Sequence, residues 1–430
     1  MEAVPLTYAQ KFIFRVQTQL GPFAPLLQLS SCVRVKGVID TDRFERAASE
    51  LVARYPVLCS RLDISTGEPM QRQVAAAPFF EIVDISGYTD HQADIMLSAR
   101  ADEPFDLFQE NPFKIVLACV GPSDAILMLL VHHLFCDETA KEMLLGEYLA
   151  LALGGSKSIT DARRESDGNS FLALAIKEQN MISNGTFSRR IQHWVRYLDG
   201  VDPALRLPGR QAEDPAVSSL ASMKFGLGRD RFQVFADRAH RLGVSQFALV
   251  ANAIFHALRE ATAQDNILIT VVSDTRRPPF DRTIGQFAGT FPIGQYSRDG
   301  GLGDNAARLI FRQIVKAVGN YVPNFCYENE IGWLKERHAK GYSMADVSVN
   351  YVPRAADFKA AARDDGQVSL FPLTARARRE DIPYHGMAIK FSFQPDKGTL
   401  GGLLEYDSVV VGHRTAEMMA SSLLKALTVP

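Results

Sequence analysis

The densest group of side chains that could do chemistry is the heptapeptide His132-His133-Leu134-Phe135-Cys136-Asp137-Glu138. It follows an apolar run and precedes a helical pattern, and catalytic side chains often lie on such loops at strand ends. Asp137 could fold back under the turn and fix its shape, leaving one imidazole free to face a cleft. A neutral imidazole there could take a proton from a hydroxyl, amine or thiol near pH 7.

Two other interpretations of this heptapeptide stay open. The first is a pair of structural histidines. The second is a metal site, since the heptapeptide offers nitrogen and oxygen ligands, although no HExxH motif or third-ligand spacing occurs elsewhere in the chain. We therefore expect no metal.

The elements around the heptapeptide are predicted by periodicity. Alternating apolar residues over 27–35 predict a strand that ends before Gly37. A helical pattern follows, which Thr41 could cap. The apolar runs 114–120 and 125–131, separated by four turn residues, predict a hairpin with a buried second strand, and the pattern over 138–152 predicts a helix.

The second half of the chain repeats this alternation of helices and strands. One helix should stop at Gly243 and the next should be capped by Ser245. Further strands are predicted at 267–272, 347–352 and 387–393, and a closing helix at 413–427. The fold class is therefore mixed α/β, built twice. Because 154–169 has hardly any large apolar residue, we expect an N-terminal lobe over 1–168 and a C-terminal lobe over 169–430.

Composition excludes several classes of protein. The chain has 430 residues with 47 Lys plus Arg and 49 Asp plus Glu, a balance that argues against coating nucleic acid or an anionic membrane. Its longest apolar run, 125–131, is a third of a membrane span. Five widely spaced cysteines without a CxxC pair fit a reducing compartment. We expect a cytoplasmic monomer with no membrane span and no nucleic-acid partner.

The heptapeptide resembles the HHxxxDG motif of the condensation-domain superfamily, which includes the condensation domains of nonribosomal peptide synthetases and chloramphenicol-acetyltransferase-like acyltransferases. Other segments resemble further motifs of this family in the same order along nearly the whole chain. They are 5–10 (PLTYAQ), 54–58 (RYPVL), 193–208, 284–292 (IGQFAGTFP), 348–351 (SVNY) and 401–407 (GGLLEYD).

This resemblance implies two chloramphenicol-acetyltransferase-like lobes in a V, with an active-site tunnel between them. It implies that His133 is the catalytic imidazole and His132 a packed supporting residue. Asp137 would be a structural anion paired with an arginine of the second lobe, either Arg276 or Arg277. The IGxF loop over 284–287 would also belong to the second lobe, together with strands that bridge back to the first.

The same resemblance implies direct transfer of an acyl group from a phosphopantetheine thioester, as a co-substrate on an acyl or peptidyl carrier protein or on coenzyme A. No bound cofactor is then expected, and Cys136 would be a spacer. Acyl transfer passes through an oxyanion that needs hydrogen-bond donors. Ser348 and Asn350 lie on the strand that would bring such donors, although they could equally be ordinary strand residues.

Two further features bear on donor and acceptor. Arg376, Arg378 and Arg379 form the densest basic cluster and could meet an acidic carrier protein or the phosphates of coenzyme A, unless they are only a solvated surface run. Glu138 replaces the motif's last glycine, so its carboxylate could narrow the tunnel, bind an amine acceptor or mark a domain that has lost catalysis.

The functional hypothesis is a free-standing condensation-type acyltransferase of natural-product biosynthesis, which forms an amide or ester with an amine or alcohol. An ester-forming acyl-coenzyme A acyltransferase acting on a lipid or polyketide alcohol is the alternative enzyme. A non-catalytic docking scaffold of a synthetase is the alternative outside enzymes. The retained His133 favours catalysis, whereas Glu138 favours the scaffold.

Overall fold

The computed structural model describes most of the chain in two compact units. The described residues are 3–21, 26–65, 67–75, 78–154, 170–207, 219–295, 303–352, 367–373, 386–396 and 398–429. The first unit comprises Met1–Asn184, Asp274–Ala288 and Ala355–Arg378, and the second comprises Gly185–Ser273, Gly289–Arg354 and Arg379–Pro430.

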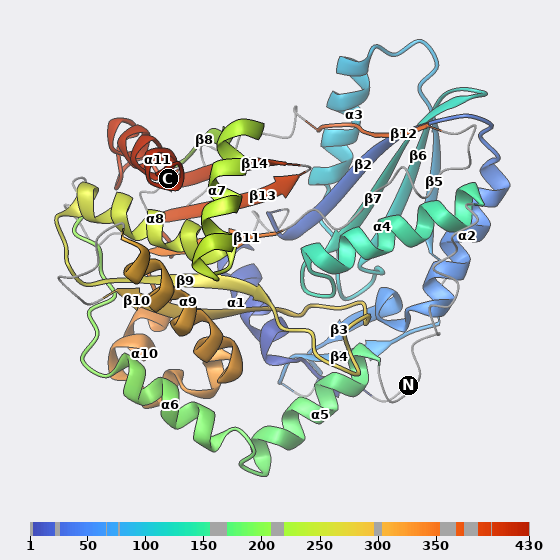
Figure 1. The fold of residues 1–430 in the computed structure, drawn as a ribbon. Coiled ribbons are helices and arrows are strands. Elements are labelled where there is room, and N and C mark those ends of the chain that lie inside the picture. Colours follow the sequence, from blue (N-terminus) through green and yellow to red (C-terminus); the bar gives the residue numbers. More distant parts are fainter. Residues whose placement is uncertain are drawn as a thin grey trace. The chain divides into compact units, whose positions relative to one another are not determined.

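The first unit is built on a five-stranded sheet with strand order β12-β2-β7-β6-β5 and a three-stranded sheet with order β1-β4-β3 (Figure 1). Its strands are β1 (Val4–Pro5), β2 (Gln28–Lys36), β3 (Ser60–Asp63), β4 (Met70–Gln73), β5 (Phe79–Asp84), β6 (Phe113–Gly121), β7 (Asp124–His132) and β12 (Gln367–Leu370). Its α-helices are α1 (Tyr8–Leu20), α2 (Thr41–Arg54), α3 (Asp90–Asp102), α4 (Glu138–Leu153) and α5 (Phe171–Ser183), and a 3-10 turn spans Pro56–Cys59.

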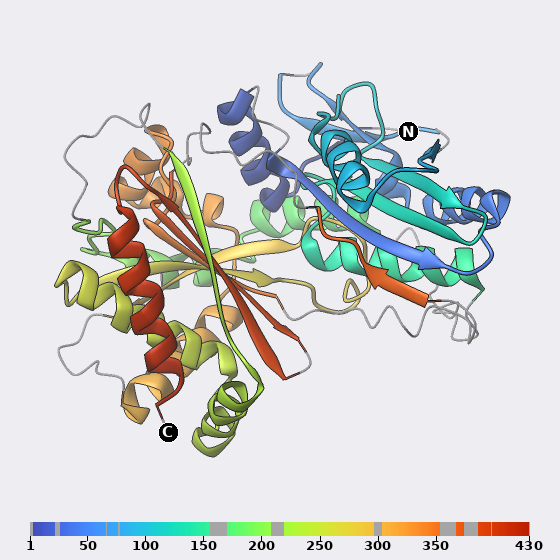
Figure 2. The ribbon, with the colours of Figure 1, turned by 90° about the horizontal axis from the view of Figure 1, so that it is seen from above.

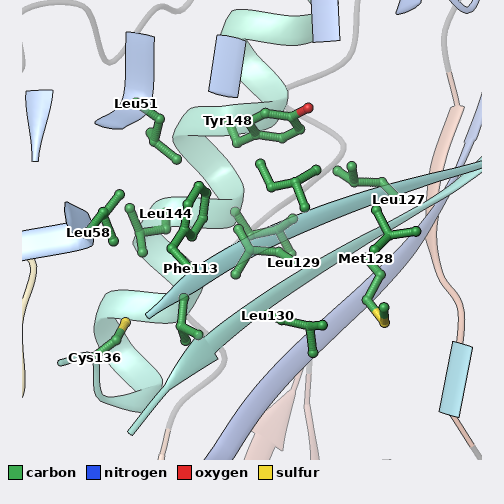
Figure 3. Close-up of a cluster of buried hydrophobic side chains, with 14 of the residues drawn as sticks. Leu51, Leu58, Phe113, Leu127, Met128, Leu129, Leu130, Cys136, Leu144 and Tyr148 are labelled. Carbon is green, nitrogen blue, oxygen red and sulfur yellow. The ribbon is translucent and has the colours of Figure 1, made fainter. Parts of the chain in front are cut away.

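The strand that leads to the heptapeptide is the buried centre of this sheet. β7 pairs antiparallel with β6, so the predicted hairpin is confirmed, and its residues from Ala125 to His132 are all buried. Figure 3 shows α4 lying along β6 and β7, with Leu144 and Tyr148 among the packed side chains. The Tyr148 hydroxyl donates to the Phe44 carbonyl oxygen at 2.9 Å, which ties α4 to α2. A rigid, apolar strand and helix therefore flank the loop that carries the histidines.

The predicted single boundary between residues 168 and 169 differs from this division in three places. Helix α5 belongs to the first unit, because Phe171 is fully buried there and its ring packs against Phe287 with centroids 5.4 Å apart. The IGxF loop lies in the same unit within Asp274–Ala288, not in the second lobe. Strand β12, which comes from the range predicted for the C-terminal lobe, pairs antiparallel with the edge of β2, as expected for a strand that bridges back to the first lobe. Figure 2 shows the orange strand beside the blue one.

The second unit is built on a six-stranded sheet with order β10-β9-β11-β13-β14-β8. Its strands are β8 (Leu220–Leu227), β9 (Ile267–Asp274), β10 (Ala288–Gln295), β11 (Val347–Tyr351), β13 (Ile389–Asp396) and β14 (Thr399–Asp407). Its α-helices are α6 (Ser188–Leu198), α7 (Arg229–Leu242), α8 (Gln246–Thr262), α9 (Asp304–Gly319), α10 (Gly332–Ala339) and α11 (His413–Leu427), and 3-10 turns span Asn324–Cys326 and Glu328–Glu330. Figure 2 shows α11 lying along this sheet.

Helix ends follow local chemistry. Gly243 ends α7 in the left-handed conformation at φ +65°, and the Ser245 side chain accepts from the Ala248 N–H at 3.1 Å, as the sequence predicts. The prediction that Thr41 caps α2 is wrong. Asp40 is the cap, and its carboxylate accepts from the Arg43 N–H at 3.1 Å. Asp and Thr are both favourable N-cap residues, so the adjacent Asp40 and Thr41 do not by themselves determine at which residue the helix begins.

Two of the family-like segments have a plain structural role in the first unit. Gln10 of the PLTYAQ segment is fully buried and exchanges two amide hydrogen bonds with Gln71 of β4, at 3.0 and 2.9 Å. In the RYPVL segment, Arg54 donates to the buried Glu147 carboxylate of α4 at 2.6 Å, and the Tyr55 hydroxyl donates to the same carboxylate. These segments fasten α1 and α2 to their neighbours.

Candidate active site

His132 is the last residue of β7 and is buried among apolar side chains. Its Nδ1 accepts a hydrogen bond from the Leu134 N–H at 3.1 Å, which assigns the proton of the neutral ring to Nε2. Its ring packs edge-on against Phe105. Burial, and then the neighbouring His133, lower the pKa of His132 to about 3. This imidazole therefore stays neutral at every physiological pH.

His133 follows the strand and is only half-buried, so its ring is more accessible than that of its neighbour. Its backbone N–H donates to the Leu27 carbonyl oxygen at 2.7 Å, which fixes the turn. Its Nδ1 lies 3.1 Å from the Cys136 carbonyl oxygen, an acceptor, so Nδ1 carries the proton and Nε2 holds the free lone pair. Burial lowers the pKa of His133, and the Cys136 carbonyl, Asp137 and Glu138 oppose this effect. The neutral form therefore dominates at pH 7.

Asp137 closes the heptapeptide as the N-cap of α4, and its buried carboxylate is saturated with donors. Its oxygens accept from the Ala140 N–H at 2.7 Å and from the Phe287 N–H at 2.8 Å. The guanidinium of Arg276 adds a two-pronged contact, with Nη1 and Nη2 each 2.9 Å from one oxygen. One carboxylate thus joins the start of α4 to both ends of the distant segment 274–288.

Arg276, not Arg277, is the partner of Asp137. Burial opposes the Arg276 charge, but attraction and hydrogen bonds from Asp137 and then Asp274 still raise its pKa. Its guanidinium also donates to the carbonyl oxygens of Thr283 and Gly285 and lies over the Phe287 ring. Arg277 instead donates to the Arg276 carbonyl oxygen. Arg276 lies in 274–288, which the structure groups with the first unit, whereas the resemblance placed this arginine in the second lobe.

Gly285 shows why the IGxF loop needs a glycine. A Cβ at this position would lie 2.1 Å from a ring carbon of Phe171, which no real contact allows. The Gly285 carbonyl oxygen also accepts from the Asp137 N–H at 3.2 Å. The loop can therefore pass between α5 and the heptapeptide only without a side chain here.

Glu138, in place of the motif glycine, is the first residue of α4 and has a cationic partner. Lys141 Nζ lies 2.5 Å from Glu138 Oε1, and the Lys141 side chain is only 7% exposed, against 37% for Glu138. The Lys141 ammonium also donates to the Ser30 carbonyl oxygen at 3.3 Å. The Glu138 carboxylate is therefore already paired within its own helix.

The buried Cys136 lies between the histidines and Asp137 in sequence. Burial, and then Asp137, raise the pKa of its thiol well above the usual range. A thiol held in its neutral form is a poor nucleophile. This chemistry agrees with a spacer role at Cys136.

Comparison with known proteins places this geometry in a family. The family model described as "Condensation domain" matches residues 1–425. The chain belongs to the condensation-domain family. Tyrocidine synthase 2 of Brevibacillus parabrevis is 23% identical over 296 residues, which is 68% of this chain and 8% of that protein. Phosphinothricin tripeptide synthetase PhsC of Streptomyces viridochromogenes is 27% identical over 299 residues, which is 67% of this chain and 27% of that protein.

The condensation-domain fold is also evident from solved structures. The X-domain from teicoplanin biosynthesis superposes with a TM-score of 0.79 at 20% identity, covering 100% of this chain and 95% of that one. The same X-domain has been solved in complex with OxyB, and that chain matches with a TM-score of 0.75 at 19% identity, covering 100% of this chain and 93% of that one. The predicted α/β fold class, typical of chloramphenicol-acetyltransferase-like proteins, is confirmed.

Two of the other residues predicted for the condensation-domain site belong to the second unit. Ser348, which is buried, and Asn350, which is partly buried, lie two residues apart on β11 in the second unit, so their side chains share one face of the sheet. Their oxyanion role stays a prediction. Arg376, Arg378 and Arg379 lie outside the described residues. Within the described ranges, no group of three or more His, Cys, Asp or Glu side chains could hold a metal ion, and no helix is long and apolar enough to cross a membrane.

Sequence reasoning missed two contributors to the site. The first is the Phe287 backbone N–H, which donates to Asp137. Almost every residue type has a backbone N–H, so the sequence does not indicate which one will bind. Lys141 could have been found, because residues three apart on a helix are neighbours and Glu138 with Lys141 has this spacing.

Proposed function

We propose that this condensation domain is an acyltransferase that moves an acyl or aminoacyl group from a pantetheine thioester to an amine or alcohol. The donor would be carried by an acyl or peptidyl carrier protein or by coenzyme A. An ester-forming enzyme that uses acyl-coenzyme A and a lipid or polyketide alcohol is the alternative within the same chemistry.

The observation that carries the proposal is the fixed tautomer of His133. Its Nδ1 proton is engaged by the Cys136 carbonyl oxygen at 3.1 Å, so Nε2 is left as a hydrogen-bond acceptor. The lowered pKa keeps the ring neutral near pH 7, as a base requires. The saturated Asp137 holds the end of the same turn and is not available for proton transfer.

In the proposed reaction, Nε2 accepts the proton of the acceptor's amine or hydroxyl as its nitrogen or oxygen attacks the thioester carbon. The carbonyl becomes a tetrahedral oxyanion, which needs hydrogen-bond donors to stabilise it. The C–S bond then breaks, and the departing thiolate takes the proton back from the imidazolium. The products are an amide or ester and the free pantetheine thiol, so no cofactor is consumed.

A docking scaffold is the second candidate. The similarity to an X-domain that forms a complex with OxyB favours it, as does Glu138 at the position of the motif glycine. A scaffold would bind a protein partner without turning over any thioester. The half-buried His133, whose Nε2 is an acceptor, favours catalysis instead, because binding a protein partner does not require an imidazole held in one tautomer.

Intact-mass spectrometry can separate the two candidates. The purified protein is mixed with a panel of acyl and aminoacyl thioesters, on holo carrier proteins and on coenzyme A, and with a panel of amines and alcohols. Enzyme-dependent loss of the acyl mass from the donor with gain on an acceptor supports the acyltransferase. No transfer above the enzyme-free rate across the panel contradicts it and favours the scaffold.

A further inference from the structure

A small cavity of about 170 Å³ lies within the second unit, between helices α6 and α9. Trp194 and Tyr197 of α6 line it with aromatic surface, and Pro292 of β10 and Ala317 of α9 add further apolar surface. An apolar cavity of about 150 Å³ in a protein core holds one benzene molecule, whereas drug-sized ligands need about 300 Å³ or more. The space between α6 and α9 therefore suits a ligand with a single ring.

The aromatic walls of this cavity are held in place by hydrogen bonds of their own. The Trp194 indole N–H donates to the Asn320 carbonyl oxygen at 2.9 Å. The Tyr197 hydroxyl accepts from the Gly294 N–H at 2.9 Å and donates to Gln313 Oε1 at 3.2 Å. Because the polar atoms of both rings already have partners, the rings are fixed and present their carbon surface to the cavity. A ligand would enter a preformed space, which lowers the cost of ordering the site.

Two polar side chains that line the cavity, His193 of α6 and Lys316 of α9, are left without partners. In the part of the chain that the structure describes, neither has a hydrogen bond or an ion pair. His193 is half-buried against the Trp194 ring, with centroids 5.2 Å apart, and burial, followed by the nearby Lys316 and Arg196, lowers its pKa. A neutral imidazole still offers one N–H donor, and the ammonium offers three. An anion at the cavity would therefore meet unused donors and a positive charge.

We propose that this cavity is a binding site for a small aromatic carboxylate, whose ring lies against Trp194 and Tyr197 and whose carboxylate is bound by Lys316 and His193. A neutral ring would leave the Lys316 charge unpaired, and an anion without a ring would leave the aromatic walls uncovered, so both parts of the ligand contribute. The inference goes beyond the proposed acyl transfer and does not rest on it. All residues that line the cavity belong to the second unit, whereas the histidine heptapeptide belongs to the first.

The test is a 19F NMR titration of the full chain labelled with 5-fluorotryptophan, which needs neither a thioester nor activity. The chain has only two tryptophans, so the spectrum has two signals, and Trp333→Phe assigns them. Trp194 lines the cavity and reports binding, whereas Trp333 is not a lining residue and serves as the internal control. The probes are benzoate, benzyl alcohol, which keeps the ring without the charge, and acetate, which keeps the charge without the ring.

Three variants separate the cavity from the general charge of the surface. Lys316→Met removes the proposed partner of the carboxylate and, because Lys316 is exposed, should leave the fold intact. Arg312→Met is the matched control, since Arg312 is an exposed cation one turn earlier on α9 that is not a lining residue. Ala317→Leu places a larger side chain at the cavity wall and should block binding.

The expected result is a saturable shift of the Trp194 signal with benzoate, at a dissociation constant of about 10 mM or below. Benzyl alcohol should bind more weakly, and acetate should cause no shift. Lys316→Met should weaken benzoate binding by about 3–10-fold, whereas Arg312→Met should leave it unchanged. The absence of a saturable shift of Trp194, or equal benzoate binding by the wild-type protein and Lys316→Met, overturns the inference, as does an equal loss in Lys316→Met and Arg312→Met.

Discussion

Replacing Asp137 by alanine should destabilise the first unit far more than removing an ordinary helix cap. The Asp137 carboxylate accepts four hydrogen bonds, two of them from a guanidinium that is 4% exposed. Stranding one partner of a buried ion pair costs about 3–5 kcal/mol, and losing a helix N-cap costs about 1 kcal/mol. The same carboxylate oxygens cap α4 and bind Arg276, so the two costs overlap. We therefore expect Asp137→Ala to lower the free energy of unfolding by about 4 kcal/mol.

Asp40→Ala is the matched control, because Asp40 caps α2 with the same chemistry but is exposed and binds only the Arg43 N–H in that role. It should cost about 1 kcal/mol. Thermal or urea unfolding of both variants measures the difference directly. Asp137→Ala combined with Arg276→Met should be less harmful than the separate losses predict, since no buried charge is stranded, whereas combination with Arg277→Met should be additive. Equal losses in the two aspartate variants, or coupling to Arg277, would refute this account of the pair.

Three further predictions concern packing, a buried network and pH. Gly285→Ala should destabilise the protein by about 1–3 kcal/mol, because the added methyl group clashes with Phe171. Gly146→Ala should stabilise it by about 0.5–1 kcal/mol, because Gly146 lies in open space within α4. Equal changes of the two variants in urea unfolding would contradict the proposed clash. Glu147→Ala should cost about 2–3 kcal/mol, because the partly exposed Arg54 loses its buried carboxylate partner and keeps the exposed Glu50, and because the Tyr55 hydroxyl loses this acceptor. Glu50→Ala, whose side chain is 51% exposed, should cost under about 1 kcal/mol. Because the His133 pKa is lowered, acyl transfer should hold at pH 6.5 and fall only at lower pH, and a half-maximal rate above pH 6.5 would contradict the neutral base.

Periodicity predicted much of this fold because its elements are regular and strongly patterned. The β6–β7 hairpin, the caps of α7 and α8 and the closing helix follow from residues near each other in the chain. The division into units does not, because Phe171 joins the first unit by contact with Gly285 and Phe287, more than 100 residues away. A long-range contact of this kind has no local pattern.

The candidate site follows the same rule: its local features could be predicted from the sequence, and its long-range contacts could not. The position of the histidines at a strand end was visible in the sequence, and the resemblance narrowed the partner of Asp137 to two neighbouring arginines. Choosing Arg276 over Arg277 requires the backbone course of 274–288, because adjacent side chains on an irregular loop point in different directions. The tautomer of His133 depends on the Cys136 carbonyl, which residue types do not specify.

Acyl transfer in a single turnover by wild-type protein and by His133→Ala tests the central claim most directly. One donor thioester that the wild-type protein accepts is mixed with excess enzyme and acceptor, and intact-mass spectra follow the acyl group with time. Circular dichroism and the melting temperature of the variant establish that the fold is kept. The account predicts that His133→Ala is slower by about 10²–10⁴-fold, the usual contribution of a positioned base. A folded His133→Ala protein that transfers the acyl group at the wild-type rate would contradict it.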